Sequence, residues 1–197
     1  MENKSINLEN FFKKACYFEG SLILVSIVLG WIVGVNPFEH IHYSENAIIY
    51  GLFGTLPLIL IFVAMQQMPI PSVQKIRELL IETLGSSMHG YHWADLFILS
   101  AVAGISEEIL FRGVIQPWME NSWGMTAGLI VSNIVFGLVH AITPLYAVLA
   151  ASVGIYLGLV LDYGGERNLL TPIIIHAAYD FFAFVIIMKA YRARLVK

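Results

Sequence analysis

Long apolar stretches are the feature of this sequence that most restricts its fold. A helix that crosses the roughly 30 Å of hydrocarbon in a bilayer needs about 20 residues, because each residue adds about 1.5 Å. Stretches of about this length, two of them shorter, recur at residues 15–35, 47–68, 96–119, 125–140, 145–162 and 169–188. We therefore predict an all-α, polytopic transmembrane helical bundle of about six spans.

The segment from Pro69 to Asp95 is more polar and carries two opposed faces. One predicted helix face is charged and the other is apolar, a pattern typical of a helix that lies on the membrane surface. The charged side chains are Lys75, Arg77, Glu78 and Glu82, and the apolar ones are Ile76, Leu79, Leu80 and Leu84. We expect an interfacial amphipathic helix between the second and third spans.

Composition narrows the class of protein further. Apolar residues make up 58% of the chain and charged residues 13%, against about 45–50% and about 25% in soluble domains. A net charge of −3 gives no electrostatic case for a polyanionic partner, and the overall composition excludes a nucleic-acid binder. The single cysteine, Cys16, allows neither an intrachain disulfide nor a thiolate metal cluster. We expect an integral membrane protein in contact with membrane lipid, whose oligomeric state the sequence leaves open.

Basic residues give the predicted orientation, since Lys and Arg that flank spans are retained on the cytoplasmic side. With six spans and both termini cytoplasmic, nine of the eleven basic residues fall inside: Lys4, Lys13, Lys14, Lys75, Arg77, Lys189, Arg192, Arg194 and Lys197. Arg167 falls outside and Arg112 within the third span. The asymmetry favours a multi-pass protein with both termini in the cytoplasm.

Ionisable residues inside these spans are the candidates for function. Each costs on the order of 3 kcal/mol or more in hydrocarbon, so such groups usually face an interior cavity. The groups are Glu107, Glu108, Arg112, His140, His176 and Asp180. Three pairs are spaced i,i+4 and so share a helix face: Glu108 with Arg112, Phe136 with His140, and His176 with Asp180. We predict that three helices bring them to one polar site.

The charge of such a site leaves two kinds of chemistry open. Three carboxylates and one guanidinium sum to −2 when both histidines are neutral, which is costly in a medium of low dielectric constant. Protons could offset this charge, and one group would then act on water as a general base. A divalent metal such as zinc could offset it instead, with Glu107, Glu108, His140, His176 and Asp180 as its ligands. The HExxH motif of common zinc proteases is absent.

Local sequence suggests how the two glutamates differ. A break at Gly104 would let Ser106 cap a new helix whose first turn holds both carboxylates. Arg112 would then pair with Glu108. We expect Glu108 to be the anchored carboxylate and Glu107 the free one.

Short motifs within the spans indicate where helices begin and where they pack closely. Thr143-Pro144 and Thr171-Pro172 each offer a capping hydroxyl followed by proline, so two helices are expected to begin there. Three GxxxG pairs predict close helix packing within the chain: Gly30 with Gly34, Gly124 with Gly128, and Gly154 with Gly158.

Three motifs in order resemble those of a known family. Ser106-Glu107-Glu108-Ile109-Leu110-Phe111-Arg112-Gly113 matches EExxxR, Phe136-Gly137-Leu138-Val139-His140 matches FxxxH, and His176-Ala177-Ala178-Tyr179-Asp180 matches HxxxN or HxxxD. The sequence resembles the CAAX-protease and bacteriocin-processing (CPBP or Abi) family of type II CAAX prenyl endopeptidase-like intramembrane proteases. We predict a single membrane-embedded domain over 1–197, with N-terminal spans and the surface helix in 1–92 and a catalytic core in 93–190.

The resemblance implies an intramembrane endopeptidase. By position, Glu107 and His140 would activate water, and His176 with Asp180 would stabilise the oxyanion. Glu108, Arg112 and Phe136 would be supporting residues. Many relatives carry Asn where this chain has Asp180, and an ionised carboxylate would repel an oxyanion. We expect Asp180 to orient His176 instead.

Alternatives remain for mechanism and role. No bound cofactor is favoured, but a metal-dependent protease would use the same residues. A non-catalytic membrane scaffold or a bacteriocin self-immunity protein is the alternative from another class. The short loops point to a small peptide or a lipid-anchored protein as substrate, arriving through the bilayer.

Overall fold

The computed structural model describes residues 2–196, with side chains from residue 11 onward, and every regular element in it is helical. The predicted all-α class is therefore confirmed for this part of the chain. The elements are α1 (Glu2–Val33), α2 (Glu45–Gln67), α3 (Pro71–Leu80), η1 (Ile81–Gly85), α4 (Ser86–Met88), α5 (Trp93–Leu110), η2 (Phe111–Ile115), α6 (Gln116–Trp123), α7 (Met125–Val139), α8 (Pro144–Val160) and α9 (Leu170–Leu195).

The apolar stretches form the long helices of a membrane protein. Phe11–Val33 of α1, the whole of α2 and the whole of α9 are long and apolar enough to cross a bilayer, and α7 and α8 are shorter apolar helices. Large apolar side chains cover the outer faces; Trp31, for example, is 84% exposed. The count of six spans and the cytoplasmic termini stay predictions, and Lys197 lies outside the described residues.

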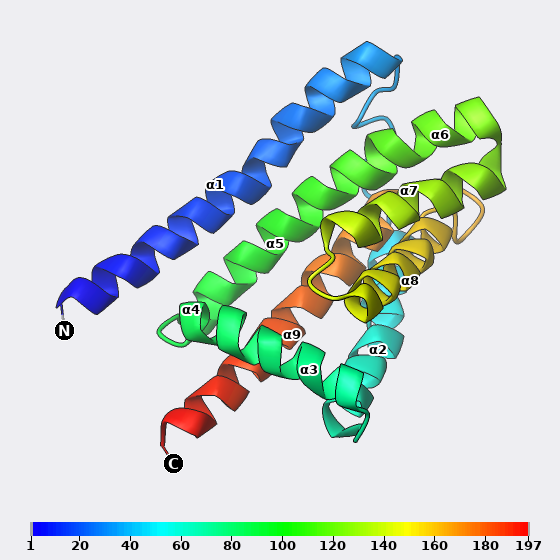
Figure 1. Cartoon of the computed structure of the whole chain (residues 1–197). Helices are drawn as coiled ribbons and strands as arrows, with labels where there is room; N and C mark the ends of the chain where they lie inside the picture. The colour runs from blue at the N-terminus through cyan, green and yellow to red at the C-terminus, as the bar shows by residue number, and fades with distance from the viewer. Residues whose placement is uncertain (1, 197) are drawn as a thin grey trace.

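A continuous helical rod, α5–η2–α6, organises the bundle (Figure 1). α1 packs along one side of α5 and α9 along another, while α2 packs on α9. α7 folds back along α6 and pairs with α8. The chain therefore surrounds α5 with helices from both ends of the sequence.

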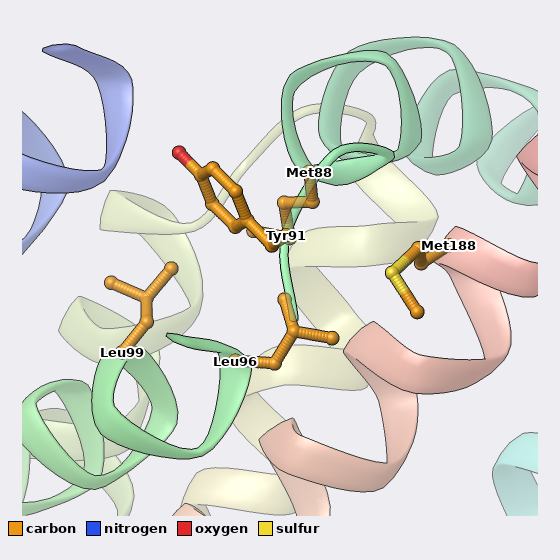
Figure 2. Packing of buried hydrophobic residues seen from close by; sticks show 5 residues of the cluster. All are labelled: Met88, Tyr91, Leu96, Leu99 and Met188. Carbon is orange, nitrogen blue, oxygen red and sulfur yellow. The ribbon is translucent and has the colours of Figure 1, made fainter. Parts of the chain in front are cut away.

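The predicted surface segment, α3–η1–α4, crosses the end of the bundle toward which α1 begins and α9 ends (Figure 1). Figure 2 shows how it docks: Met88 and Tyr91 meet side chains of α5 and α9 in one cluster. The cluster is completed by Leu96, Leu99 and Met188. Burial raises the pKa of the Tyr91 phenol to about 12, so this residue stays neutral in its apolar setting.

Of the two threonines predicted to cap a helix, one does so and the other does not. Thr143 caps α8 by accepting a hydrogen bond from the amide of Tyr146, as expected. Thr171 does not cap α9, which begins one residue earlier, at Leu170. The amide of Leu170, the first residue of α9, instead donates to the side chain of Asn168.

The predicted break before the two glutamates is wrong. α5 runs unbroken from Trp93 to Leu110, and the Ser106 hydroxyl donates backward to the carbonyl of Val102, 2.6 Å away. Glu107 and Glu108 therefore lie in the last turns of α5. The irregularity comes after them, in the π-helical turn η2, a feature often found at functional sites.

Gly104 serves close helix packing. A Cβ atom there would lie 2.7 Å from the backbone nitrogen of Ala177 in α9. The glycine therefore lets α9 approach α5 closely enough for their polar side chains to meet.

The other glycines divide between packing and helix ends. Gly158 packs against Leu129 and Gln116, as the GxxxG prediction requires. Gly34 instead has a φ of +71° and follows the last residue of α1. Only glycine adopts this backbone readily, so Gly34 ends its helix.

We expect Gly104→Ala to destabilise the fold by about 1–3 kcal/mol, because backbone of α9 must move to admit the methyl group. Thermal unfolding in detergent measures the change. Gly20→Ala is the matched control, because no atom lies within 4 Å of a Cβ at this helical position. The control should unfold at or slightly above the wild-type temperature; equal destabilisation of both variants would contradict the packing argument.

Candidate active site

Glu107 and His140 meet at the junction of α5 and α7. Glu107 Oε2 lies 3.4 Å from His140 Nε2, and Glu107 is 8% exposed. His140 Nδ1 lies 2.8 Å from the carbonyl of Phe136 and donates to it, since a carbonyl only accepts. When the ring is neutral, Nε2 therefore carries a lone pair directed toward a carboxylate oxygen that also only accepts. Two acceptors facing each other are suited to share the hydrogens of a water molecule.

Glu108 is held by two hydrogen-bond partners of its own. Its Oε1 accepts from Arg112 Nη1 at 3.0 Å and from His176 Nδ1 at 2.7 Å. All three side chains are buried, and Glu108 is 0% exposed. The pairing of Glu108 with Arg112 is the one that the helical spacing predicted.

Arg112 connects three helices. Besides Glu108, its guanidinium donates to the Asn133 side chain in α7 at 2.9 Å and to the carbonyl of Gly154 in α8 at 2.8 Å. Its carbon Cζ also lies 4.8 Å from the centre of the Phe136 ring. One buried cation therefore sets the positions of the helices that carry the site.

The Phe136 ring lies between the two histidines and contacts both of them. Its ring centre lies 4.3 Å from that of His140 and 6.2 Å from that of His176. The ring is 4% exposed, so it restricts the orientation of both imidazoles.

Asp180 lies one turn beyond His176 on α9. Its Oδ2 is 3.6 Å from His176 Nε2, longer than a hydrogen bond. The group that holds the imidazole by hydrogen bond is Glu108, through Nδ1. The orienting role expected of Asp180 thus falls geometrically to Glu108, and His176 Nε2 faces Asp180 and the interior of the site.

Several residues of the site were not singled out from the sequence. Asn133 could be found only through its contact with Arg112. Glu19 offered a signal, an acidic residue inside the first apolar stretch, and the structure brings it within electrostatic range of Glu107, His140 and Asp180. Tyr146, in the first turn of α8, likewise lies within electrostatic range of Asp180 and Glu107.

A second polar group continues along the same rod toward the α8–α9 loop. Gln116 donates to Glu120 at 2.8 Å, and Glu120 pairs with Arg167 at 2.7 Å. The hydrogen bond to Asp162, together with that to Glu120, raises the pKa of Arg167, so this cation is permanent. Arg167 thus ties the loop to α6.

The fit of a metal can be tested on the side chains themselves. Among residues 11–196, no three His, Cys, Asp or Glu side chains converge as a group that could hold a metal ion. Glu107 and Glu108 contact different histidines, His140 and His176. These side chains therefore do not form a ready metal site.

These features define a class: a helical membrane protein with two carboxylate–imidazole contacts, Glu107 with His140 and Glu108 with His176, of which the second is buried and paired with an arginine. The comparison with protein families adds one likeness. Residues 89–182 match the family model described as Rce1-like, type II CAAX prenyl endopeptidase Rce1-like. No curated protein and no solved structure matches the chain.

Proposed function

We propose that this protein is an intramembrane endopeptidase that hydrolyses a peptide bond of a membrane-associated or lipid-anchored peptide with water activated by Glu107 and His140. The observation that supports it most directly is the 3.4 Å contact between Glu107 Oε2 and His140 Nε2. Both atoms can accept a proton, and both belong to motifs inside the matched segment.

In this proposal a water molecule binds beside the pair, within hydrogen-bond distance of both acceptors. Glu107 takes one proton as general base while the water oxygen attacks the scissile carbonyl carbon. The hydrogen bond from His140 Nδ1 to the Phe136 carbonyl keeps the ring turned with Nε2 toward the water. Phe136 excludes other water from this side of the pair.

His176 is the proposed donor to the oxyanion. Glu108 holds Nδ1 of His176, so the second ring nitrogen, Nε2, can present an N–H to the oxyanion when the ring is charged. Stabilisation of an oxyanion by a fixed donor is commonly a large part of such catalysis. Asp180 acts through His176 in this scheme.

The assay uses purified protein in detergent or liposomes with a fluorogenic peptide bearing a lipid anchor, and mass spectrometry identifies the cleaved bond. Turnover that persists after exhaustive chelation, in protein that metal analysis finds to be metal-free, supports the metal-free mechanism. Loss of turnover on chelation, restored by zinc, would support the metal-dependent alternative. Absence of cleavage with lipidated and unmodified peptides alike would favour the scaffold or immunity alternative. Comparing prenylated with acylated anchors in the same assay tests the substrate class.

We expect Asp180→Asn to keep activity within about tenfold of wild type, because an amide can still face His176 and can itself donate to an oxyanion. The turnover rate at saturating substrate measures this. Asp162→Asn, at the Arg167 pair away from the site, is the matched control. Complete loss in Asp180→Asn alone would show that the negative charge of Asp180 is required.

A further inference from the structure

Glu19 is the one acidic residue of α1 within its bilayer-length apolar segment, Phe11–Val33. α1 packs along α5, and the residues on either side of Glu19 fix which way it faces. Cys16, one turn before it, packs on the cluster of Figure 2, and Leu22, one turn after it, packs on Leu110, Phe111 and Phe136. Glu19 shares this inward face, so its carboxyl group is directed toward α5 and the site.

Glu19 lies near the ionisable groups of the site. It interacts electrostatically with groups from three other helices: Glu107 of α5, His140 after α7, and His176 and Asp180 of α9. Its Oε2 atom is buried and has no hydrogen-bond partner among the described residues. This oxygen is therefore buried near the site and has no hydrogen bond to hold it.

The three other carboxylates of the site each have a cationic or imidazole neighbour. Glu107 contacts His140, and Glu108 and Asp180 contact His176. Among the described side chains, no cation lies within ion-pair distance of Glu19. An unpaired carboxylate is expensive in an apolar span, whereas a carboxylic acid is far less so. Glu19 is thus suited to carry a proton while Glu107 accepts one.

We propose that Glu19 is a further catalytic residue, the general acid that protonates the leaving amine. This inference rests on the proposed peptidase function. The proton of the attacking water goes to Glu107 as the new C–O bond forms. When the tetrahedral intermediate collapses, the carbonyl re-forms and the C–N bond breaks with its electron pair on nitrogen, which takes the proton of Glu19. The proton on Glu107 then passes to Glu19, directly or through water, and the net change is addition of one water to the amide.

A change of leaving group tests this step, because an amine must be protonated to leave and a nitrophenolate need not be. In the full-length protein, Glu19→Gln should lower the kcat for a peptide amide by about 100-fold, a typical contribution of general acid catalysis. The 4-nitrophenyl ester of the same acyl peptide should be hydrolysed within about threefold of the wild-type rate. Glu19→Asp, which keeps the acid, should recover part of the amide activity.

Controls separate this inference from the proposed function. Ser21→Ala, on an exposed part of α1, should behave as wild type with both substrates, and thermal unfolding in detergent establishes that each variant is folded. An inactive wild type, or wild-type rates in Glu107→Gln, would overturn the proposed function and the role of Glu19 with it. Suppose that the wild type is active and that Glu107→Gln is impaired. Two results would then overturn the role of Glu19 alone: Glu19→Gln retains amide hydrolysis, or it loses amide and ester hydrolysis equally.

Discussion

Replacing Glu107 by Gln should reduce peptide hydrolysis by about 10²–10⁴-fold, because an amide cannot take the proton of the attacking water. The side chain keeps its size, so its contact with α7 should persist and the fold should remain intact. The measurement is the cleavage rate of the lipidated fluorogenic peptide at saturating concentration, which isolates kcat from binding. Glu107→Asp should recover little of the hydrolysis rate. Its side chain is one methylene group shorter, so the carboxylate lies farther from the attacking water.

Two further measurements make the Glu107 result specific. Glu82→Gln removes an exposed carboxylate of η1 and should leave the rate unchanged. Binding of an uncleavable analogue to Glu107→Gln should remain close to that of wild type, because the residue is proposed to act on water and not on the peptide. Turnover in Glu107→Gln equal to that of wild type would disprove the glutamate mechanism.

Replacing Arg112 by Leu should give the largest loss of stability. The change leaves the Glu108 carboxylate, the Asn133 oxygen and the Gly154 carbonyl without their donor in a buried site. Removing one partner of a buried ion pair costs about 3–5 kcal/mol. Thermal or denaturant unfolding in detergent measures the loss, and Lys75→Met on exposed α3 is the control that removes a charge without a buried partner.

A double variant separates the structural role of this pair from catalysis. Arg112→Met with Glu108→Leu removes both charges together, and a buried ion pair replaced by apolar side chains is often neutral or better in stability. We expect stability well above that of Arg112→Leu. Hydrolysis should remain low, because His176 has lost the acceptor of its Nδ1 hydrogen. Turnover of the double variant equal to that of wild type would show that hydrolysis does not require Glu108 to orient His176.

Much of the fold could be predicted because the bilayer imposes lengths that the sequence shows directly. Each predicted apolar stretch corresponds to a helix or to the rod α5–η2–α6. The contact between Glu108 and Arg112 also follows from helical spacing alone. The depth in the bilayer of the ionisable side chains could not be derived from the lengths of the spans. Straight spans place His140 and His176 near opposite faces, yet both meet neighbouring glutamates of α5.

The remaining errors have a common physical origin in tertiary contacts. Ser106 looked like a helix cap because its hydroxyl can satisfy a free amide, but in an unbroken helix it bonds to the preceding turn. Glu19 lies close enough to Lys13 and Lys14 to resemble the polar flank of a span. Only the packing of α1 on α5 shows that it faces the interior. Asn133 has no motif that marks it, and Arg112 alone gives it a role.

The reach of Arg112 across three helices has a consequence for biosynthesis. Its bond to the Gly154 carbonyl requires α8, and the imidazole that completes Glu108 comes from α9, near the end of the chain. A nascent chain that has inserted only its first helices holds Glu107 but lacks these partners. In the proposed mechanism, hydrolysis should therefore begin only after α8 and α9 have packed into the bundle.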